Sequence, residues 1–249
     1  MPQDREVRHI PRTRRHREAR YIPRARRHRE AWHIPRMRPG NEAAHPETRA
    51  QSYNALMEAD PTNILTDVRN RHEFRMWLEQ NHAIEADCWI EVRRGRPANG
   101  NVFWYLDAVE EALCFGWVDS IHKEIGGVRL QRFTPRKPKS PWTELNKERV
   151  RRLEKLGLMT DAGRAVLPPM GPRSFRIDPD VQAALKAARC WTKFRQFPPL
   201  YQRIRTYNVA FYKGRDPETY EKALANLITR TKRGEMYGEW NDYGRLLEY

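Results

Sequence analysis

Trp117-Val-Asp-Ser-Ile-His-Lys-Glu-Ile-Gly-Gly-Val-Arg-Leu-Gln-Arg-Phe133 is the stretch that decides the fold. Two short runs rich in strand-forming residues, 117–121 and 128–133, flank the pair Gly126-Gly127. Because glycine adopts positive φ angles without steric cost, the pair favours a tight turn between antiparallel strands. The stretch therefore predicts a small antiparallel sheet, and a further strand is predicted at 88–92.

Helical patterns surround these strands. Apolar residues recur at i, i+3 and i+4 in 72–81 and again in 105–115, where Gly116 ends the second helix. Ser140-Pro141 predicts the start of the next helix, because serine can cap the free amides and proline is tolerated at the first helical position. That helix is expected to end at Gly157.

Three more helices are predicted from their start signals, Asp178-Pro179, Pro198-Pro199 and Asp216-Pro217, and Gly234 ends the last of them. The sequence thus predicts a helix-rich α+β fold, in which a small antiparallel sheet packs with helices. We expect an α+β core over residues 59–170 and a C-terminal helical half, residues 171–249, that shares this core.

The first forty residues contain a twelve-residue repeat that begins His9-Ile-Pro-Arg, Tyr21-Ile-Pro-Arg and His33-Ile-Pro-Arg. Residues 1–50 hold 14 Arg, no Lys and 6 acidic residues, a net charge of +8. Each proline would break a helix and the like charges repel each other. Residues 1–58 are therefore predicted to form a disordered arm.

Arginine suits bidentate contact with phosphate, so one interpretation of the arm is binding to RNA, DNA or an acidic membrane surface. The candidate arginines of the repeat are Arg12, Arg14, Arg15, Arg24, Arg26 and Arg27. Two alternatives stay open, a solvated tail and a mis-started extension, because Met57 immediately precedes the part that resembles an ordered domain.

The 249-residue chain carries a net charge of +15, which favours acidic partners. Its three cysteines are far apart and form no C-x-x-C pair. We therefore expect buried reduced thiols, and we expect neither a disulfide framework nor a metal site. No apolar run approaches the length of a membrane span, and no secretory signal is evident. We therefore expect a cytoplasmic protein.

Four blocks of sequence carry a family resemblance. They are Phe74-Arg-Met-Trp-Leu-Glu-Gln-Asn-His82, Glu111-Ala-Leu-Cys-Phe-Gly-Trp-Val-Asp119, Arg132-Phe-Thr-Pro-Arg-Lys-Pro-Lys-Ser-Pro-Trp142 followed by Asn146 and Arg149, and Leu156-Gly-Leu-Met-Thr-Asp-Ala-Gly163. In this order they resemble the YdeI/OmpD-associated, or bacteriocin-protection, family. The segment 213–219 matches the family's lysine-rich pattern only loosely.

The resemblance implies a cytoplasmic protein linked to tolerance of bacteriocins and cationic antimicrobial peptides, and to association with an outer-membrane porin. It implies no catalytic residue and no cofactor. We therefore expect action through a protein partner or an anionic ligand.

If the two strands pair, side chains suited to binding an anion should gather where a sheet end meets a helix start. The candidate ligand-binding residues are Trp117, Asp119, Arg132, Arg136, Lys137, Ser140, Trp142 and Asn146. The competing interpretation is that the tryptophans are core residues and that the basic run is a solvated loop. An enzyme that uses the Asp119/Arg136 region, with His82 and Asp119 as an acid–base pair, is a further alternative.

Overall fold

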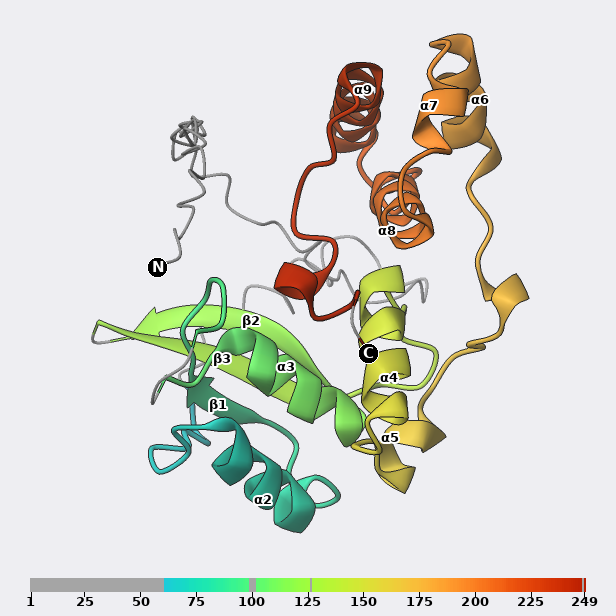
Figure 1. Ribbon diagram of the computed structural model, residues 1–249. Helices are drawn as coiled ribbons and strands as arrows, with labels where there is room; N and C mark the ends of the chain where they lie inside the picture. Colours follow the sequence, from blue (N-terminus) through green and yellow to red (C-terminus); the bar gives the residue numbers. More distant parts are fainter. Residues whose placement is uncertain (1–60, 99–101, 126, 248) are drawn as a thin grey trace, which may run out of the picture. The chain divides into compact units, whose positions relative to one another are not determined.

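The computed structural model describes residues 61–98, 102–125, 127–247 and 249 (Figure 1). The predicted disordered arm, with its six candidate arginines, lies outside these residues. The described chain has the predicted helix-rich α+β fold, with one three-stranded antiparallel sheet.

The sheet has the order β1-β3-β2 and is built on the predicted hairpin. Its strands are β1 (Cys88–Glu91), β2 (Trp117–Ile125) and β3 (Val128–Pro135). Both hairpin strands run further than the sequence pattern predicted, and Gly127 adopts a φ of +81° at the turn. The register places Asp119 opposite Phe133, whereas Arg132 faces Trp89 of β1.

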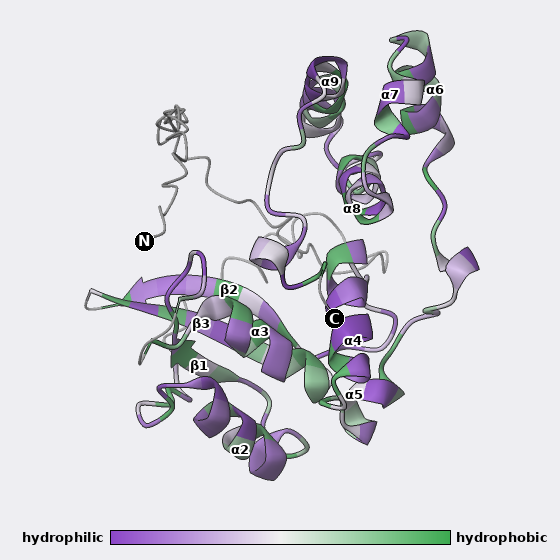
Figure 2. Cartoon of the chain, in the orientation of Figure 1, coloured by the Kyte–Doolittle hydropathy of each residue, from purple (hydrophilic) through white to green (hydrophobic). Residues whose placement is uncertain are grey.

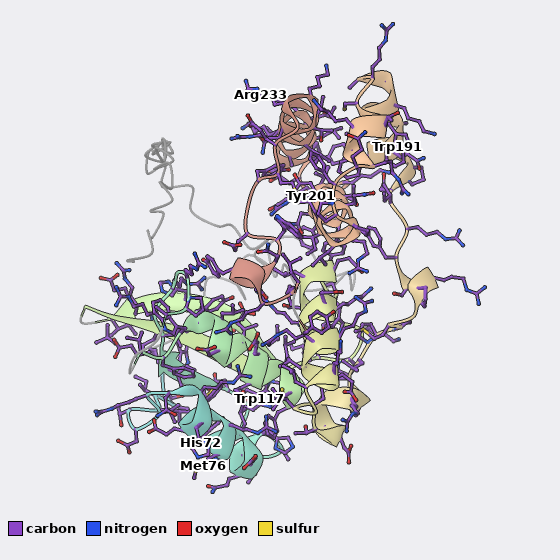
Figure 3. All side chains as sticks on the ribbon, in the orientation of Figure 1. His72, Met76, Trp117, Trp191, Tyr201 and Arg233 are labelled. Atoms are coloured by element: carbon purple, nitrogen blue, oxygen red, sulfur yellow. The ribbon has the colours of Figure 1, made fainter. Side chains whose placement is uncertain are left out.

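Helices α2 (Arg71–Asn81) and α3 (Tyr105–Cys114) pack against one face of this sheet. The rings of Phe74 on α2 and Phe133 on β3 lie 5.4 Å apart. Trp117, which is 1% exposed, belongs to the same cluster (Figure 3). As predicted, α3 stops at Gly116, which has a φ of +75°.

Helix α4 (Glu144–Lys155) begins three residues later than predicted, so the assignment of Ser140-Pro141 as its start is wrong. Lys139 adopts a φ of +61°, and the amide of Ser140 donates to the carbonyl O of Lys137, which closes a turn. The cap is Thr143, whose hydroxyl accepts from the amide of Asn146 at 3.0 Å.

The three C-terminal helices begin where the sequence predicted, and the last of them ends at Gly234 as predicted. Asp178 and Asp216 each cap a helix with their carboxylates, and Gly234 ends the last helix with a φ of +75°. The helices are α6 (Pro179–Ala187), α8 (Pro199–Ala210) and α9 (Pro217–Arg233). The short elements α5 (Asp161–Ala165), η1 (Pro172–Ser174), α7 (Trp191–Phe194) and η2 (Asp242–Gly244) were not predicted.

Within the described residues, buried apolar side chains form two clusters. One joins the sheet to α2, α3 and α4, and the other joins α6 to α9 and the C-terminal segment. Helix α4, largely hydrophilic in Figure 2, contributes Val150 and Leu153 to the first, while its Leu145 packs against the second. The division of the chain at residue 170 stays a prediction.

None of the helices in the described ranges is both long and apolar enough to cross a membrane.

Candidate functional site

Arg136 follows β3 directly and is the central residue of the candidate site. It is 6% exposed, and its guanidinium carbon lies 3.7 Å from the ring centroid of Trp142. Nη1 donates to the carbonyl O of Pro141 at 3.4 Å, whereas Nε and Nη2 have no hydrogen-bond partner among the described residues. Burial lowers the pKa of Arg136 from its ordinary 12.5 to about 10, although the charge of Asp119 opposes this.

Asp119 on β2 is held by a neighbouring tyrosine. The hydroxyl of Tyr105 donates to Oδ2 of Asp119 at 2.6 Å. Burial, together with the Asp119 charge, raises the pKa of Tyr105, so that the hydroxyl keeps its proton and donates. The guanidinium of Arg94 lies 4.0 Å from the Tyr105 ring centroid. The Asp119 carboxylate therefore accepts a hydrogen bond from Tyr105, and the positive charge of Arg94 lies on the ring of that tyrosine.

Arg149 on α4 forms a buried ion pair with the C-terminal segment. Its Nε and Nη2 donate to the two carboxylate oxygens of Asp242 at 2.7 and 2.8 Å, and its Nη1 donates to Oδ1 of Asn146 at 2.8 Å. Burial alone would lower the pKa of Arg149, but the charge of Asp242 raises it above its ordinary value. This arginine, unlike Arg136, has all its donor groups engaged.

The site carries more positive than negative charge. Three guanidinium groups, those of Arg94, Arg136 and Arg149, stand against the two carboxylates of Asp119 and Asp242. A net charge of +1 follows, and the group with unused donors is Arg136.

The structure brings together four of the eight predicted ligand-binding residues. Asp119, Arg136, Trp142 and Asn146 belong to the buried polar cluster just described. Trp117 is a core residue whose indole N–H donates to the carbonyl O of His82 at 3.1 Å. The competing interpretation, that the tryptophans are core residues, is therefore correct for Trp117, and Trp142, which is 8% exposed, belongs to the same apolar cluster.

The remaining predicted residues lie apart from the cluster. Arg132 precedes Phe133 on β3, so its side chain projects from the opposite face of the sheet to Asp119. There its Nε donates to Asp87 Oδ2 at 2.7 Å. Lys137 is exposed and Ser140 is half-buried in the turn before α4.

Two open clefts lie near the cluster, and neither is lined by Asp119, Arg136 or Asn146. The larger, of about 490 Å³, is lined by Glu144 and Lys147 in the first turn of α4 and by Tyr207 on α8. Tyr207 interacts electrostatically with both Glu144 and Arg136. Tyr207 therefore links the cleft, which it lines, to the charge of Arg136.

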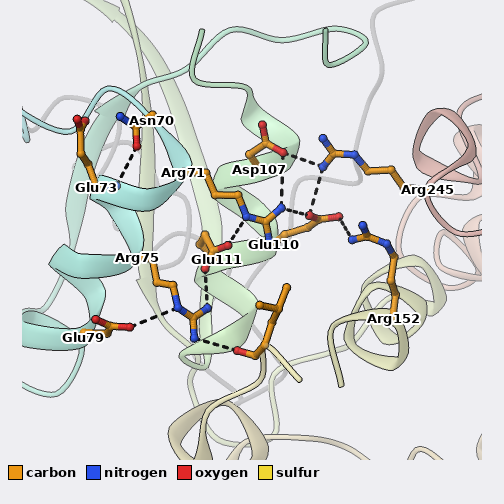
Figure 4. Close-up of polar contacts among 11 residues, drawn as sticks. Asn70, Arg71, Glu73, Arg75, Glu79, Asp107, Glu110, Glu111, Arg152 and Arg245 are labelled. Atoms are coloured by element: carbon orange, nitrogen blue, oxygen red, sulfur yellow. Dashed lines mark hydrogen bonds and ion pairs between the residues drawn. The ribbon is translucent and has the colours of Figure 1, made fainter. Parts of the chain in front are cut away.

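The smaller cleft, of about 400 Å³, borders an ion-pair network that the sequence did not predict. Glu110 on α3 is fully buried and accepts from Arg71, Arg152 and Arg245 at 2.7, 2.8 and 3.2 Å (Figure 4). Its neighbour Glu111 pairs with Arg71 and Arg75. The only sequence signal is two adjacent glutamates in an apolar helix, and their partners lie as far away as residue 245.

The proposed acid–base pair finds different partners. His82 Nδ1 lies 2.7 Å from the carbonyl O of Leu78, and Asp119 is bound to Tyr105. The three cysteines are buried and free, as predicted, and burial raises the pKa of the Cys114 thiol to about 12. At neutral pH this thiol is protonated and a poor nucleophile.

The fold and the site define a helix-rich α+β protein with a buried arginine–aromatic cluster between its sheet and helices. A family described as a domain of unknown function, DUF8412, matches residues 66–166, from the segment before α2 to the end of α5. Comparisons with curated proteins and with solved structures found no match. The resemblance to the YdeI/OmpD-associated family stays a prediction.

Proposed function

We propose that the described part of the chain binds a small anionic ligand, and that Arg136 recognises its anionic group. The observation that supports this is a buried guanidinium with two unused nitrogen donors. A buried donor without a partner costs about 1–3 kcal/mol. Carboxylate and phosphate oxygens accept paired hydrogen bonds from a guanidinium, so such a ligand would supply the missing partners.

The larger cleft offers room for the rest of the ligand. Its volume of about 490 Å³ lies within the usual range of small-molecule sites. It borders the first turn of α4, where the helix dipole favours negative charge. In this proposal the ligand enters from the cleft, displaces the side chain of Tyr207 and reaches Arg136 above the Trp142 ring.

A second buried arginine, Arg205, provides a comparison, because it too has unpartnered donors but is not proposed as a ligand site. Arg205 also has unpartnered Nε and Nη2 atoms, and its guanidinium lies 4.7 Å from the ring centroid of Tyr237 and 5.8 Å from that of Tyr201. Neither cleft is lined by Arg205 or by these two tyrosines. Arg136 differs in that it interacts electrostatically with Tyr207, a residue that lines the larger cleft.

The proposal is tested by calorimetric titration of the full chain with inorganic phosphate, pyrophosphate and a nucleoside monophosphate. Arg136→Met is expected to abolish the binding of whichever of these binds the wild type. Arg132→Met is the matched control, because this arginine lies in the same sequence segment but pairs with Asp87 on the other face of the sheet. Equal affinities in wild type and Arg136→Met would contradict the proposal.

We further propose, from the sequence resemblance, a cytoplasmic protein that contributes to tolerance of cationic antimicrobial peptides. A deletion strain should then survive such a peptide less well, and the wild-type gene should restore survival. Failure of Arg136→Met to restore it would connect tolerance to the anion site, whereas full restoration would favour a protein partner bound elsewhere.

A further inference from the structure

The C-terminal helices carry an exposed basic surface that is separate from the anion site. We define the α6–α7–α9 basic surface as Lys186, Arg189, Lys193, Arg195, Lys232 and Arg233, all of which are exposed. Residues 186–197 contain four basic and no acidic residues. Figure 3 labels Trp191 and Arg233 on α7 and α9, among long side chains that end in nitrogen.

Direct contacts make this surface continuous. Nζ of Lys193 on α7 donates to the carbonyl O of Lys232 at the end of α9, at 2.7 Å. Arg189 lies in the short connection between α6 and α7. The cations of α7 and α9 therefore lie side by side, and Arg189 stands in the connection that leads into α7.

These cations lack the carboxylate partners that some other exposed cations of the C-terminal helical half have. Among the described residues, no ion pair involves any of the six. By contrast, Lys213 pairs with Asp178 and Asp180, and Lys222 pairs with Glu218. The basic surface thus presents uncompensated charge, whereas the opposite ends of α6 and α9 do not.

Compensation of helix dipoles explains only part of the surface. Cations in the last turns of α6 and α9 are stabilised by the helix ends, which accounts for Lys186 and Lys232. Arg195 follows α7. Arg189 follows α6 and has a positive φ angle, which is unfavourable for any residue with a side chain. Dipole compensation does not require either of them.

Arg189 adopts a φ of +56°, in the left-handed region. Its amide donates to the carbonyl O of Lys186, and the amide of Cys190 donates to that of Leu185. This is the Schellman ending of a helix, in which glycine is the residue without strain. The chain carries a strained arginine there, which indicates a use for the side chain beyond helix termination.

We propose that the α6–α7–α9 basic surface binds the phosphate backbone of single-stranded nucleic acid, with Trp191 as a stacking platform. Trp191 is half-buried on the Phe194 ring, and the Arg195 guanidinium lies 5.7 Å from its centroid. Cations around an aromatic ring match how single strands are bound without sequence preference. Stable membrane attachment draws on apolar burial as well as on charge, and none of the exposed large apolar side chains described lies in α6, α7 or α9.

The test measures how the affinity of the full chain for a fluorescein-labelled oligothymidylate depends on salt, by fluorescence anisotropy. Each phosphate contact to a single strand contributes about 0.7 to the slope of log K against log salt. Lys193→Gln/Arg233→Gln should therefore lower the slope by about 1.4. The difference between slopes is used because the arginines of residues 1–58 can add contacts of their own.

The control is Lys222→Gln/Arg129→Gln, which removes the same charge from two exposed cations that have carboxylate partners. Its slope should equal that of the wild type. Trp191→Leu keeps the apolar packing and should weaken binding about tenfold without a change of slope. Equal slopes in the test and control variants would overturn the proposal, as would selective loss of binding to phosphatidylserine vesicles with unchanged binding to the oligonucleotide.

Discussion

The same substitution at two buried arginines should have opposite effects on stability. Arg136→Met removes a guanidinium whose pKa falls from 12.5 to about 10 because of burial. A pKa difference of this size corresponds to about 3 kcal/mol of unfavourable burial of the charged form. The lost contact with the Trp142 ring offsets about 0.5–2 kcal/mol of this gain. We therefore expect Arg136→Met to stabilise the protein by about 1–2.5 kcal/mol.

Arg149→Met breaks a bidentate pair and leaves the Asp242 carboxylate buried without a partner. The expected loss is about 3–5 kcal/mol. Both variants are compared with the wild type by urea denaturation. The dependence of the free energy of unfolding on urea concentration should be the same in all three proteins. If Arg136→Met destabilised the protein as Arg149→Met is expected to, the Arg136 guanidinium would already have its partner within the fold. The argument for a ligand would then fail.

Three further predictions concern local structure. Arg189→Gly should raise the free energy of unfolding by about 1 kcal/mol because it relieves the left-handed strain, and thermal denaturation would show a lower melting temperature if this reasoning were wrong. Gly163→Ala should cost about 3 kcal/mol, because its Cβ would lie 2.2 Å from the carbonyl O of Cys114; a neutral result in urea denaturation would contradict the close approach. Burial would raise the pKa of Glu148, but hydrogen bonds from Tyr249 and Arg151 hold this pKa below its ordinary 4.5. The ionised Glu148 therefore stabilises the fold fully above pH 4.5, and this stabilisation is lost as the pH falls through the lowered pKa. Tyr249→Phe should move that loss to higher pH, and an NMR titration of Glu148 that is unchanged by the substitution would refute this.

Helix boundaries and the hairpin could be predicted from the sequence because their causes are local. Gly116 and Gly234 end helices through a positive φ, and Asp178 caps one with its own carboxylate. The predicted start of α4 was wrong because Ser140-Pro141, although a typical helix start, does not begin the helix in the structure. Ser140-Pro141 has the right residue types, yet the left-handed Lys139 before it closes a turn, and Thr143 caps the helix instead.

The candidate site could be predicted only in part, because sequence proximity does not determine which face a strand residue occupies. Arg132 and Arg136 lie in one segment and were expected to converge. Strand alternation directs Arg132 to Asp87 on the far face, while Arg136 follows the end of β3 and packs on Trp142.

By itself the sequence determined the class of fold, the places where most helices begin and end, and the segment that holds Arg136. These depend on interactions within a few residues. Only the tertiary structure decided which charges are paired, because ion pairs form between groups that folding brings together. Arg149 meets Asp242 across 93 positions of the chain, and Glu110 meets Arg245 across 135. The tertiary structure also buries Arg136, which directly follows the hairpin. Two of its nitrogen donors stay without a partner because no carboxylate of the described chain is packed against them.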